Sequence, residues 1–279
     1  MISIINFFKD NYLIILILVT GSLFKIPVIW ESYPIVNNLD EPYLINSGLR
    51  VLNNIYLYKS LDPEFYTWGS FPIYVCAFLN SILILTKYFF FNPYNLSLEA
   101  LSYSIQRIDF YIINRIFSFL LMNLSIFIVY YLCKKNFNYF VAILASIILV
   151  ISPKYLSLST MATVDHWHVF FSALIVFYSF ELNRNFNSMK NIAIYAVVLG
   201  ISVATKYYNF LFIIPIITIL ITRIIKKEFP YRQIILLSSI SLFAFFISMP
   251  YSLINFSDFL NSLESISNNY KSHPGADSD

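Results

Sequence analysis

Long apolar stretches alternate with short polar clusters along the whole chain. The first, residues 11–30, is long enough to cross a membrane as one helix of about 20 residues. Its apolar part is longer than the core of a signal peptide and no small-residue cleavage site follows it, so we interpret it as an uncleaved anchor. Six further stretches are predicted to span: 110–133, 139–155, 167–182, 192–204, 207–221 and 234–249.

The positive charges predict the orientation of these spans. Cytoplasmic loops retain Lys and Arg, and the densest clusters are "RIIKKEFPYR" (residues 223–232) and the pair Lys134-Lys135. If both clusters and the N-terminus lie inside, the apolar stretch 70–91, which contains Lys87, must lie in the interface or dip partly into the membrane. In the alternative, this stretch spans and the N-terminus lies outside.

Composition supports a membrane protein and excludes several other classes. The 279 residues are 58% hydrophobic and only 12% charged, with a mean hydropathy of +0.69, which is more apolar surface than a soluble domain of this size buries. We therefore predict an all-α polytopic protein of about seven transmembrane helices. Its single domain covers residues 1–279, and its long first outer segment, residues 31–109, carries interfacial helices. No basic, aromatic-interleaved patch suggests nucleic-acid binding.

Two motifs stand in the predicted first outer segment. Asp40, Glu41 and Pro42 open the sequence "DEPYLINSGLRVLNN", where an acidic residue followed by proline is also typical of a helix start. Capping and catalysis are both open interpretations of this pair, and they are compatible. About twenty residues later, "SLDPEFYTWGSFPIY" forms an aromatic turn that ends at Tyr74 and leads into the apolar stretch.

Together, "LDEPYLINSGLRVL" and "LDPEFYTWGSFPIY" resemble the first outer loop of the polyprenyl-phosphate-dependent membrane glycosyltransferases of the GT-C type. This superfamily includes protein O-mannosyltransferases and aminoarabinose transferases, and the bacterial phospholipid carrier-dependent glycosyltransferases are the most similar branch. In that branch the second motif ends in Pro-Ser-Leu-Pro-x-Tyr. Residues 69–74 stand in its place, with Gly69 for the first proline and Phe71 for leucine.

Three later segments continue the resemblance in the same order. "INRIFSFLLMNLSIFIVYYLCKKNF" is similar to the family span that opens with an arginine and closes on a basic pair, which gives Arg115. "ISPKYLSLSTMATVDHWHVFFSAL" is similar to the next span and loop, which gives Asp165. "GISVATKYYNFLFIIP" is similar to the family turn that gives Lys206. The resemblance also implies further spans beyond this chain, so we expect a fragment or a truncated form of a longer fold.

The resemblance implies a site on the extracytoplasmic face of a bacterial plasma membrane. The donor is a polyprenyl-phosphate sugar, whose phosphate would lie near Arg115 and Lys206, with Asp165 and Tyr74 also contributing to the binding site. Asp40 would act as general base on an acceptor hydroxyl of a lipid, glycan or protein, and the product would be an inverted glycoside. Glu41 would position Asp40 or the acceptor.

Several alternatives stay open on the residues alone. Lys and Arg near outer span ends also snorkel to lipid headgroups, and Tyr207 and Tyr208 are expected interfacial anchors. The carboxylates could supply hard oxygen ligands to a divalent cation, but no spacing demands one, so metal is left unassigned. His166 and His168 are i and i+2 and so do not share a helix face. A polytopic transporter and a non-catalytic membrane assembly protein are the rival functions.

Overall fold

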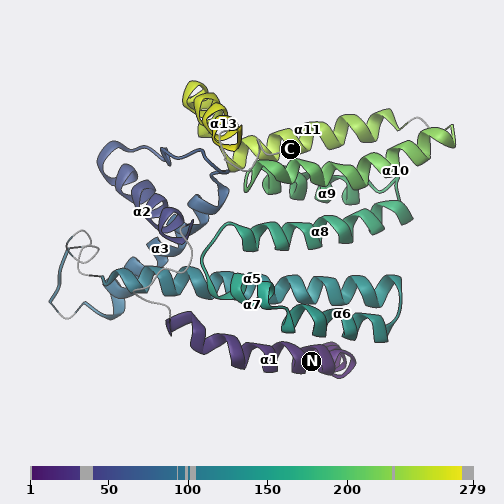
Figure 1. Cartoon of the computed structure of the whole chain (residues 1–279), viewed down its shortest axis with the longest axis horizontal. Coiled ribbons are helices and arrows are strands. Elements are labelled where there is room, and N and C mark those ends of the chain that lie inside the picture. The colour runs from purple at the N-terminus through teal and green to yellow at the C-terminus, as the bar shows by residue number, and fades with distance from the viewer. Residues whose placement is uncertain are drawn as a thin grey trace.

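The computed structural model describes residues 2–31, 40–92, 94–97, 100, 105–227 and 230–271. In this part of the chain the regular structure is helical, and no β-strand occurs. The long helices lie side by side in one bundle (Figure 1), and they are α1 (Ile2–Glu31), α5 (Arg107–Asn136), α6 (Tyr139–Ile151), α8 (Asp165–Arg184), α9 (Met189–Val203), α10 (Ile214–Ile225) and α11 (Tyr231–Ser248). The predicted all-α architecture is confirmed for the described residues.

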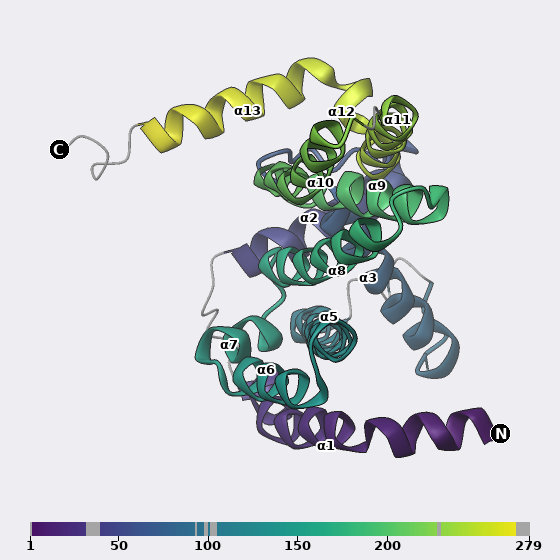
Figure 2. The ribbon, with the colours of Figure 1, turned by 90° about the vertical axis from the view of Figure 1, so that its right-hand side faces the viewer.

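Shorter or differently oriented helices complete the fold. They are α2 (Asp40–Tyr58), α3 (Phe71–Phe90), α7 (Pro153–Thr160), the 3₁₀ helix η1 (Tyr207–Ile213), α12 (Tyr251–Ile254) and α13 (Phe256–Lys271). Seen along the bundle, α1 lies at one side, α5 and α8 lie in the middle, and α9, α10 and α11 lie at the other side (Figure 2). Helix α2 and α3 lie beyond the end of the bundle, beside the first turns of α5 (Figure 1).

Length and composition confirm a multi-pass membrane protein. In the described part, five helices are long and apolar enough to cross a bilayer, namely Asp10–Trp30, Phe71–Phe90, Arg107–Asn136, Tyr207–Ile225 and Tyr231–Ser248. The pair α6 and α7 makes a sixth if it is one span bent by 65°. Pro153 explains this bend, because it starts α7 and cannot donate the hydrogen bond that would continue α6. The 15 residues of α9 are apolar but short, and the number of seven spans stays a prediction.

Helix α3 begins and ends at the same end of the bundle. At its start, the Phe71 backbone N–H donates to the carbonyl of Ala204, where α9 ends (3.1 Å). Near its end, Lys87 forms an ion pair with Asp109 in the first turn of α5. Because α9 ends and α5 begins at this one end (Figure 1), the arrangement favours an interfacial position for α3 although its composition would suit a span.

Helix α2 is amphipathic and packs closely on α3. Its buried residues Leu44, Ile45, Gly48 and Val51 recur at helical spacing and face the interior. Gly48 lets the helices approach, since a Cβ atom at this position would lie 2.7 Å from the Sγ atom of Cys76. The start of α2 is thereby held against the bundle, which matters because Asp40 and Glu41 are its first residues.

The aromatic turn after α2 docks on the turn between α9 and η1. The Tyr207 hydroxyl donates to the carbonyls of Tyr66 (2.7 Å) and Trp68 (3.2 Å). Gly69 lies so close to Ala204 that an added Cβ atom would be 1.8 Å from its carbonyl oxygen. Tyr207 is therefore a structural link between the turn before α3 and the start of η1, whereas the sequence had suggested an interfacial anchor.

A second contact joins the same turn to the segment after α11. Asp62 accepts hydrogen bonds from the Tyr66 hydroxyl (2.8 Å), from the Glu64 backbone N–H (2.9 Å) and from the side-chain amide of Asn255. The Tyr251 hydroxyl accepts from the backbone N–H of Leu61 (3.0 Å). The turn between α2 and α3 is thus fixed both to the segment after α9 and to the segment after α11, and this leaves little freedom in the position of α3.

We expect Gly69→Ala to destabilise the protein. The new methyl group would meet the Ala204 carbonyl at 1.8 Å, and relieving such a clash costs about 1 to 3 kcal/mol. Thermal unfolding in detergent, followed by circular dichroism, should show a lower midpoint than for Thr67→Ala, an exposed position in the same turn. Equal midpoints for the two variants would contradict the close approach.

Candidate functional site

Glu41 forms a buried ion pair with Arg115. The Arg115 Nε atom lies 2.7 Å from Glu41 Oε1, and Nη2 lies 2.8 Å from Oε2, so the two groups meet in a bidentate arrangement. Their side chains are 0% and 1% exposed. Such charge-assisted, paired hydrogen bonds are among the strongest that side chains make, and they fix the start of α2 against α5.

The pair also binds two other segments through backbone groups. Arg115 Nη1 donates to the carbonyl of Ile29 near the end of α1 (3.0 Å). The backbone N–H of Ala162, in the segment between α7 and α8, donates to Glu41 Oε1 (2.9 Å). Four parts of the chain therefore meet at one ion pair. Neither backbone partner could be identified from the sequence, because a peptide group carries no residue-type signal.

Arg115 consequently faces protein atoms rather than open space. Its guanidinium is hydrogen-bonded to Glu41 and Ile29, and it lies 5.7 Å from the centre of the Tyr111 ring. The sequence prediction placed a donor phosphate at this residue. The structure brings Arg115 to Glu41 instead, so we treat both residues as positioning residues below.

Asp165 and Lys206 form a second ion pair, which is partly exposed. Asp165 is the first residue of α8, and Lys206 immediately precedes η1. The Lys206 ammonium donates to Asp165 Oδ1, and the two side chains are 19% and 30% exposed respectively. The ammonium also lies 5.1 Å from the centre of the Tyr208 ring. Unlike the buried pair, this one is accessible to a ligand.

Asp40 lies close to this second pair. The Ala162 contact with Glu41 brings the start of α2 to the segment that leads into α8. Burial raises the pKa of Asp40 above its ordinary value, the charge of Asp165 raises it further, and the charge of Lys206 lowers it. Burial would lower the pKa of Lys206, but the hydrogen bond and charge of Asp165 outweigh it and raise that pKa. Three of the predicted residues, from three separate segments, thus form one charged cluster.

Tyr74 does not belong to this cluster in the described structure. Its hydroxyl is buried and has no hydrogen-bond partner among the described residues. Its ring lines a separate groove between α2, α3 and the end of α11. The charged and titratable groups that act on it are Asp62 and Tyr251. Of the residues predicted for substrate binding, Tyr74 and Arg115 therefore lie outside this charged cluster.

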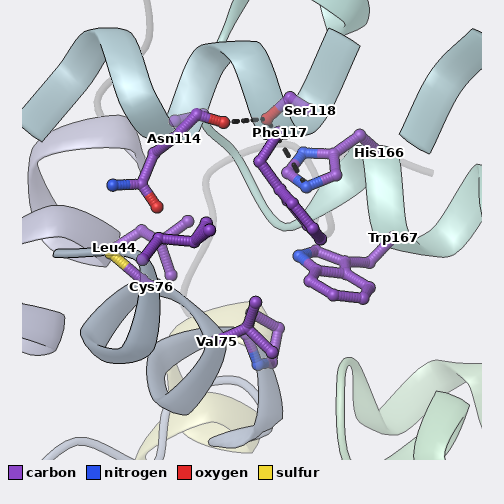
Figure 3. Close-up of a pocket in the computed structure, with 11 residues that line it drawn as sticks. Leu44, Val75, Cys76, Asn114, Phe117, Ser118, His166 and Trp167 are labelled. Atoms are coloured by element: carbon purple, nitrogen blue, oxygen red, sulfur yellow. Dashed lines mark hydrogen bonds between the residues drawn. The ribbon is translucent and has the colours of Figure 1, made fainter. Parts of the chain in front are cut away.

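The two histidines beside Asp165 point to different neighbours, as their i and i+2 spacing predicted. His166 is 2% exposed and lies 3.5 Å from the Ser118 hydroxyl through Nε2. With Asn114 it lines a cavity of about 10 Å³ (Figure 3), which is room for about one water molecule. His168 contacts the Asn209 side chain instead. In the described part of the chain, no three His, Cys, Asp or Glu residues are grouped so that they could hold a metal ion.

Comparison with known proteins identifies one family. The family model for dolichyl-phosphate-mannose-protein mannosyltransferases matches residues 93–250, which is more than half of the chain. Arg115, Asp165 and Lys206 lie inside the matched range, whereas Asp40 and Glu41 lie before it. No curated protein and no solved structure matches the chain significantly.

We expect the two halves of the buried ion pair to be strongly coupled in their effect on the stability of the fold. Glu41→Leu alone leaves a buried guanidinium without its counter-charge, which costs about 3 to 5 kcal/mol. Arg115→Met alone likewise leaves the buried Glu41 carboxylate without its counter-charge. The double variant removes both charges and should recover a large part of the loss.

Chemical or thermal unfolding of the four proteins in detergent gives this double-mutant cycle. Additive losses in the double variant would contradict the pair as the organising contact of the site. Lys135→Met with Glu181→Leu provides a control cycle, because that pair is partly exposed, with 34% and 19% of its side chains accessible. Its coupling should be much smaller.

Proposed function

We propose, because this chain belongs to the dolichyl-phosphate-mannose-protein mannosyltransferase family, that it transfers a sugar from a polyprenyl-phosphate donor to an acceptor hydroxyl. Family membership itself makes the protein a GT-C-type membrane glycosyltransferase, which confirms the resemblance found in the sequence. The finer assignment of donor, acceptor and catalytic base is our proposal. The observation that carries it is the cluster of Asp40, Asp165 and Lys206 at the start of α2 and α8.

In the proposed reaction, Asp40 is the general base. The acceptor oxygen attacks the anomeric carbon from the face opposite the phosphate, and its proton passes to the Asp40 carboxylate. The bond between the anomeric carbon and the phosphate oxygen breaks, and the polyprenyl phosphate leaves with the electron pair. A raised pKa suits this role, because a carboxylate of higher pKa is a stronger base near neutral pH.

Lys206 is the residue proposed to face the leaving phosphate. Its ammonium is partly exposed and its raised pKa keeps it charged, so it can stabilise the negative charge that develops on the phosphate oxygens. Asp165 holds Lys206 in place by the ion pair and raises the pKa of Asp40. Glu41 and Arg115 hold the backbone of α2 so that Asp40 stays beside this pair.

The proposed acceptor side is the extracytoplasmic face, with the N-terminus in the cytoplasm. Basic residues support this orientation, since Lys134 and Lys135 lie in the last turn of α5 and Arg184 lies in the last turn of α8. The charged cluster lies at the opposite ends of those elements. Cytoplasmic ends retain Lys and Arg, so the cluster would be outside. The acceptor class is a lipid, a glycan or a protein carrying a free hydroxyl.

Asp40→Asn should abolish sugar transfer. The amide cannot accept the acceptor proton, and loss of a general base lowers rates by roughly 10²- to 10⁴-fold. The measurement is incorporation of labelled sugar from a panel of polyprenyl-phosphate sugars into lipids, glycans and proteins of membranes that contain the chain. Asp258→Asn, an exposed carboxylate in α13, is the matched control and should keep full activity. Equal transfer by Asp40→Asn and wild type would exclude Asp40 as the base, and would leave a transporter or assembly role as the better explanation of this site.

The pH profile tests the electrostatics of the cluster. If ionised Asp40 is the base, kcat/KM should fall at low pH. The apparent pKa of this acidic limb should lie above the ordinary aspartate pKa of about 3.9. Asp165→Asn removes the charge that raises this pKa, so the limb should move to lower pH even though the maximal rate falls. If the apparent pKa of the acidic limb is unchanged in Asp165→Asn, the group that titrates is not Asp40.

A further inference from the structure

A group of basic side chains lies at the end of the bundle opposite Asp165 and Lys206, and the reaction proposed above does not use it. This inner basic cluster consists of four exposed side chains from α9, from the turn after α10 and from α11, namely Lys190, Lys226, Lys227 and Arg232. Among the residues that the structure describes, no acidic side chain forms an ion pair with any of the four. The cluster therefore presents uncompensated positive charge at one surface.

Tertiary packing brings the α9 lysine into the cluster. Gly200 of α9 lies so close to α11 that an added Cβ atom would be 2.3 Å from the carbonyl oxygen of Ser241. Both helices run from the basic end of the bundle to the end that carries Asp165 (Figure 1). Lys190 precedes Gly200 by ten residues and Arg232 precedes Ser241 by nine. The two basic residues therefore lie at nearly the same level, because the rise per residue is the same in both helices.

The length of the preceding span places the cluster at a membrane surface. Tyr207–Ile225 is long and apolar enough to cross a bilayer. Its seven 3₁₀ and twelve α-helical residues rise about 32 Å, close to the hydrocarbon thickness of about 30 Å. Lys206 immediately precedes this span and Lys226 immediately follows it. The end of α10 also projects past the neighbouring ends of α5, α6 and α8 (Figure 1), so Lys226 reaches the level of lipid headgroups.

Exposed apolar side chains accompany the basic ones. Ile224, Ile225 and Tyr231 are 46%, 75% and 62% exposed. In the interface, acyl chains cover such groups while the long basic side chains extend to the headgroups. A soluble anion would pair with the charges and leave the apolar groups in water. The mixture of charge and apolar surface therefore fits a phospholipid better than a free phosphate.

We propose that the inner basic cluster binds the headgroups of anionic phospholipids, in the cytoplasmic leaflet if the orientation proposed above holds. Charge complementarity selects this class, because a zwitterionic headgroup carries an ammonium of its own that the cluster repels. Each basic residue near an anionic lipid surface raises the affinity about fivefold. Bound headgroups hold the end of α10 at a fixed depth. Lys206, at the other end of the same span, is thereby held at the opposite surface.

Native mass spectrometry of the full chain in detergent tests this site. The probes are phosphatidylglycerol and phosphatidylcholine with identical acyl chains, and the wild type should bind the first more tightly. Replacing Lys226, Lys227 and Arg232 together by Gln should lower the affinity for phosphatidylglycerol about 100-fold and leave that for phosphatidylcholine unchanged. The matched control removes the same charge from two lysines and one arginine that are exposed elsewhere, by Arg50→Gln, Lys59→Gln and Lys154→Gln, and should bind phosphatidylglycerol like the wild type.

The outcomes separate the possible ligands. Equal affinity of the wild type for the two lipids, or equal losses in the two triple variants, would overturn the assignment. Displacement of phosphatidylglycerol by inorganic phosphate would assign the cluster to a soluble anion instead. If the triple variant does not fold, Lys227→Gln alone replaces it, and its affinity for phosphatidylglycerol should fall about fivefold; no loss would overturn the proposal. Each of these measurements is independent of sugar transfer.

Discussion

The buried pair of Glu41 and Arg115 is the interaction on which the rest of the site depends. It joins the start of α2 to α5, and its backbone contacts to Ile29 and Ala162 add α1 and the segment before α8. A charge alone in this environment would be strongly unfavourable, so each partner requires the other. The fold can therefore accept only arrangements in which these four segments meet, and the position of Asp40 follows from that requirement.

Two adjacent carboxylates thus have different roles because their surroundings differ. Glu41 points inward and is neutralised by a guanidinium, whereas Asp40 remains partly exposed and close to Asp165 and Lys206. Burial and a neighbouring negative charge raise the pKa of Asp40, and a nearby ammonium limits the rise. One helix start therefore supplies both an anchor and a group suited to proton transfer. Glu41, which fixes the geometry, is fully buried.

Helix α3 separates two environments at the end of the bundle. One face packs toward α5 and α8, where Asn114, Ser118 and His166 line a small cavity together with apolar side chains (Figure 3). The other face lines the apolar groove toward α2 and α11. The turn before α3 is held on both sides, by Tyr207 at the start of η1 and by Asn255 after α11. Helix α3 therefore separates this small cavity from the apolar groove.

The sequence by itself determined the class of protein, the all-α architecture and the residues of the charged cluster. Apolar runs of about 20 residues are sufficient to indicate membrane helices, because the thickness of the bilayer sets their length. The order of the motifs selected Asp40, Asp165 and Lys206 as candidates, and their roles stay a prediction. The partner of Arg115 was decided only by the tertiary structure, since a guanidinium binds a lipid phosphate and a protein carboxylate equally well until the fold shows which one is present. The location of Tyr74 was undecided for a similar reason, because proximity along the chain does not specify which face of α3 meets α11. The groove could not be predicted at all, since its walls come from segments up to 199 residues apart in the sequence, from Val51 to Pro250, and only their packing creates the space between them.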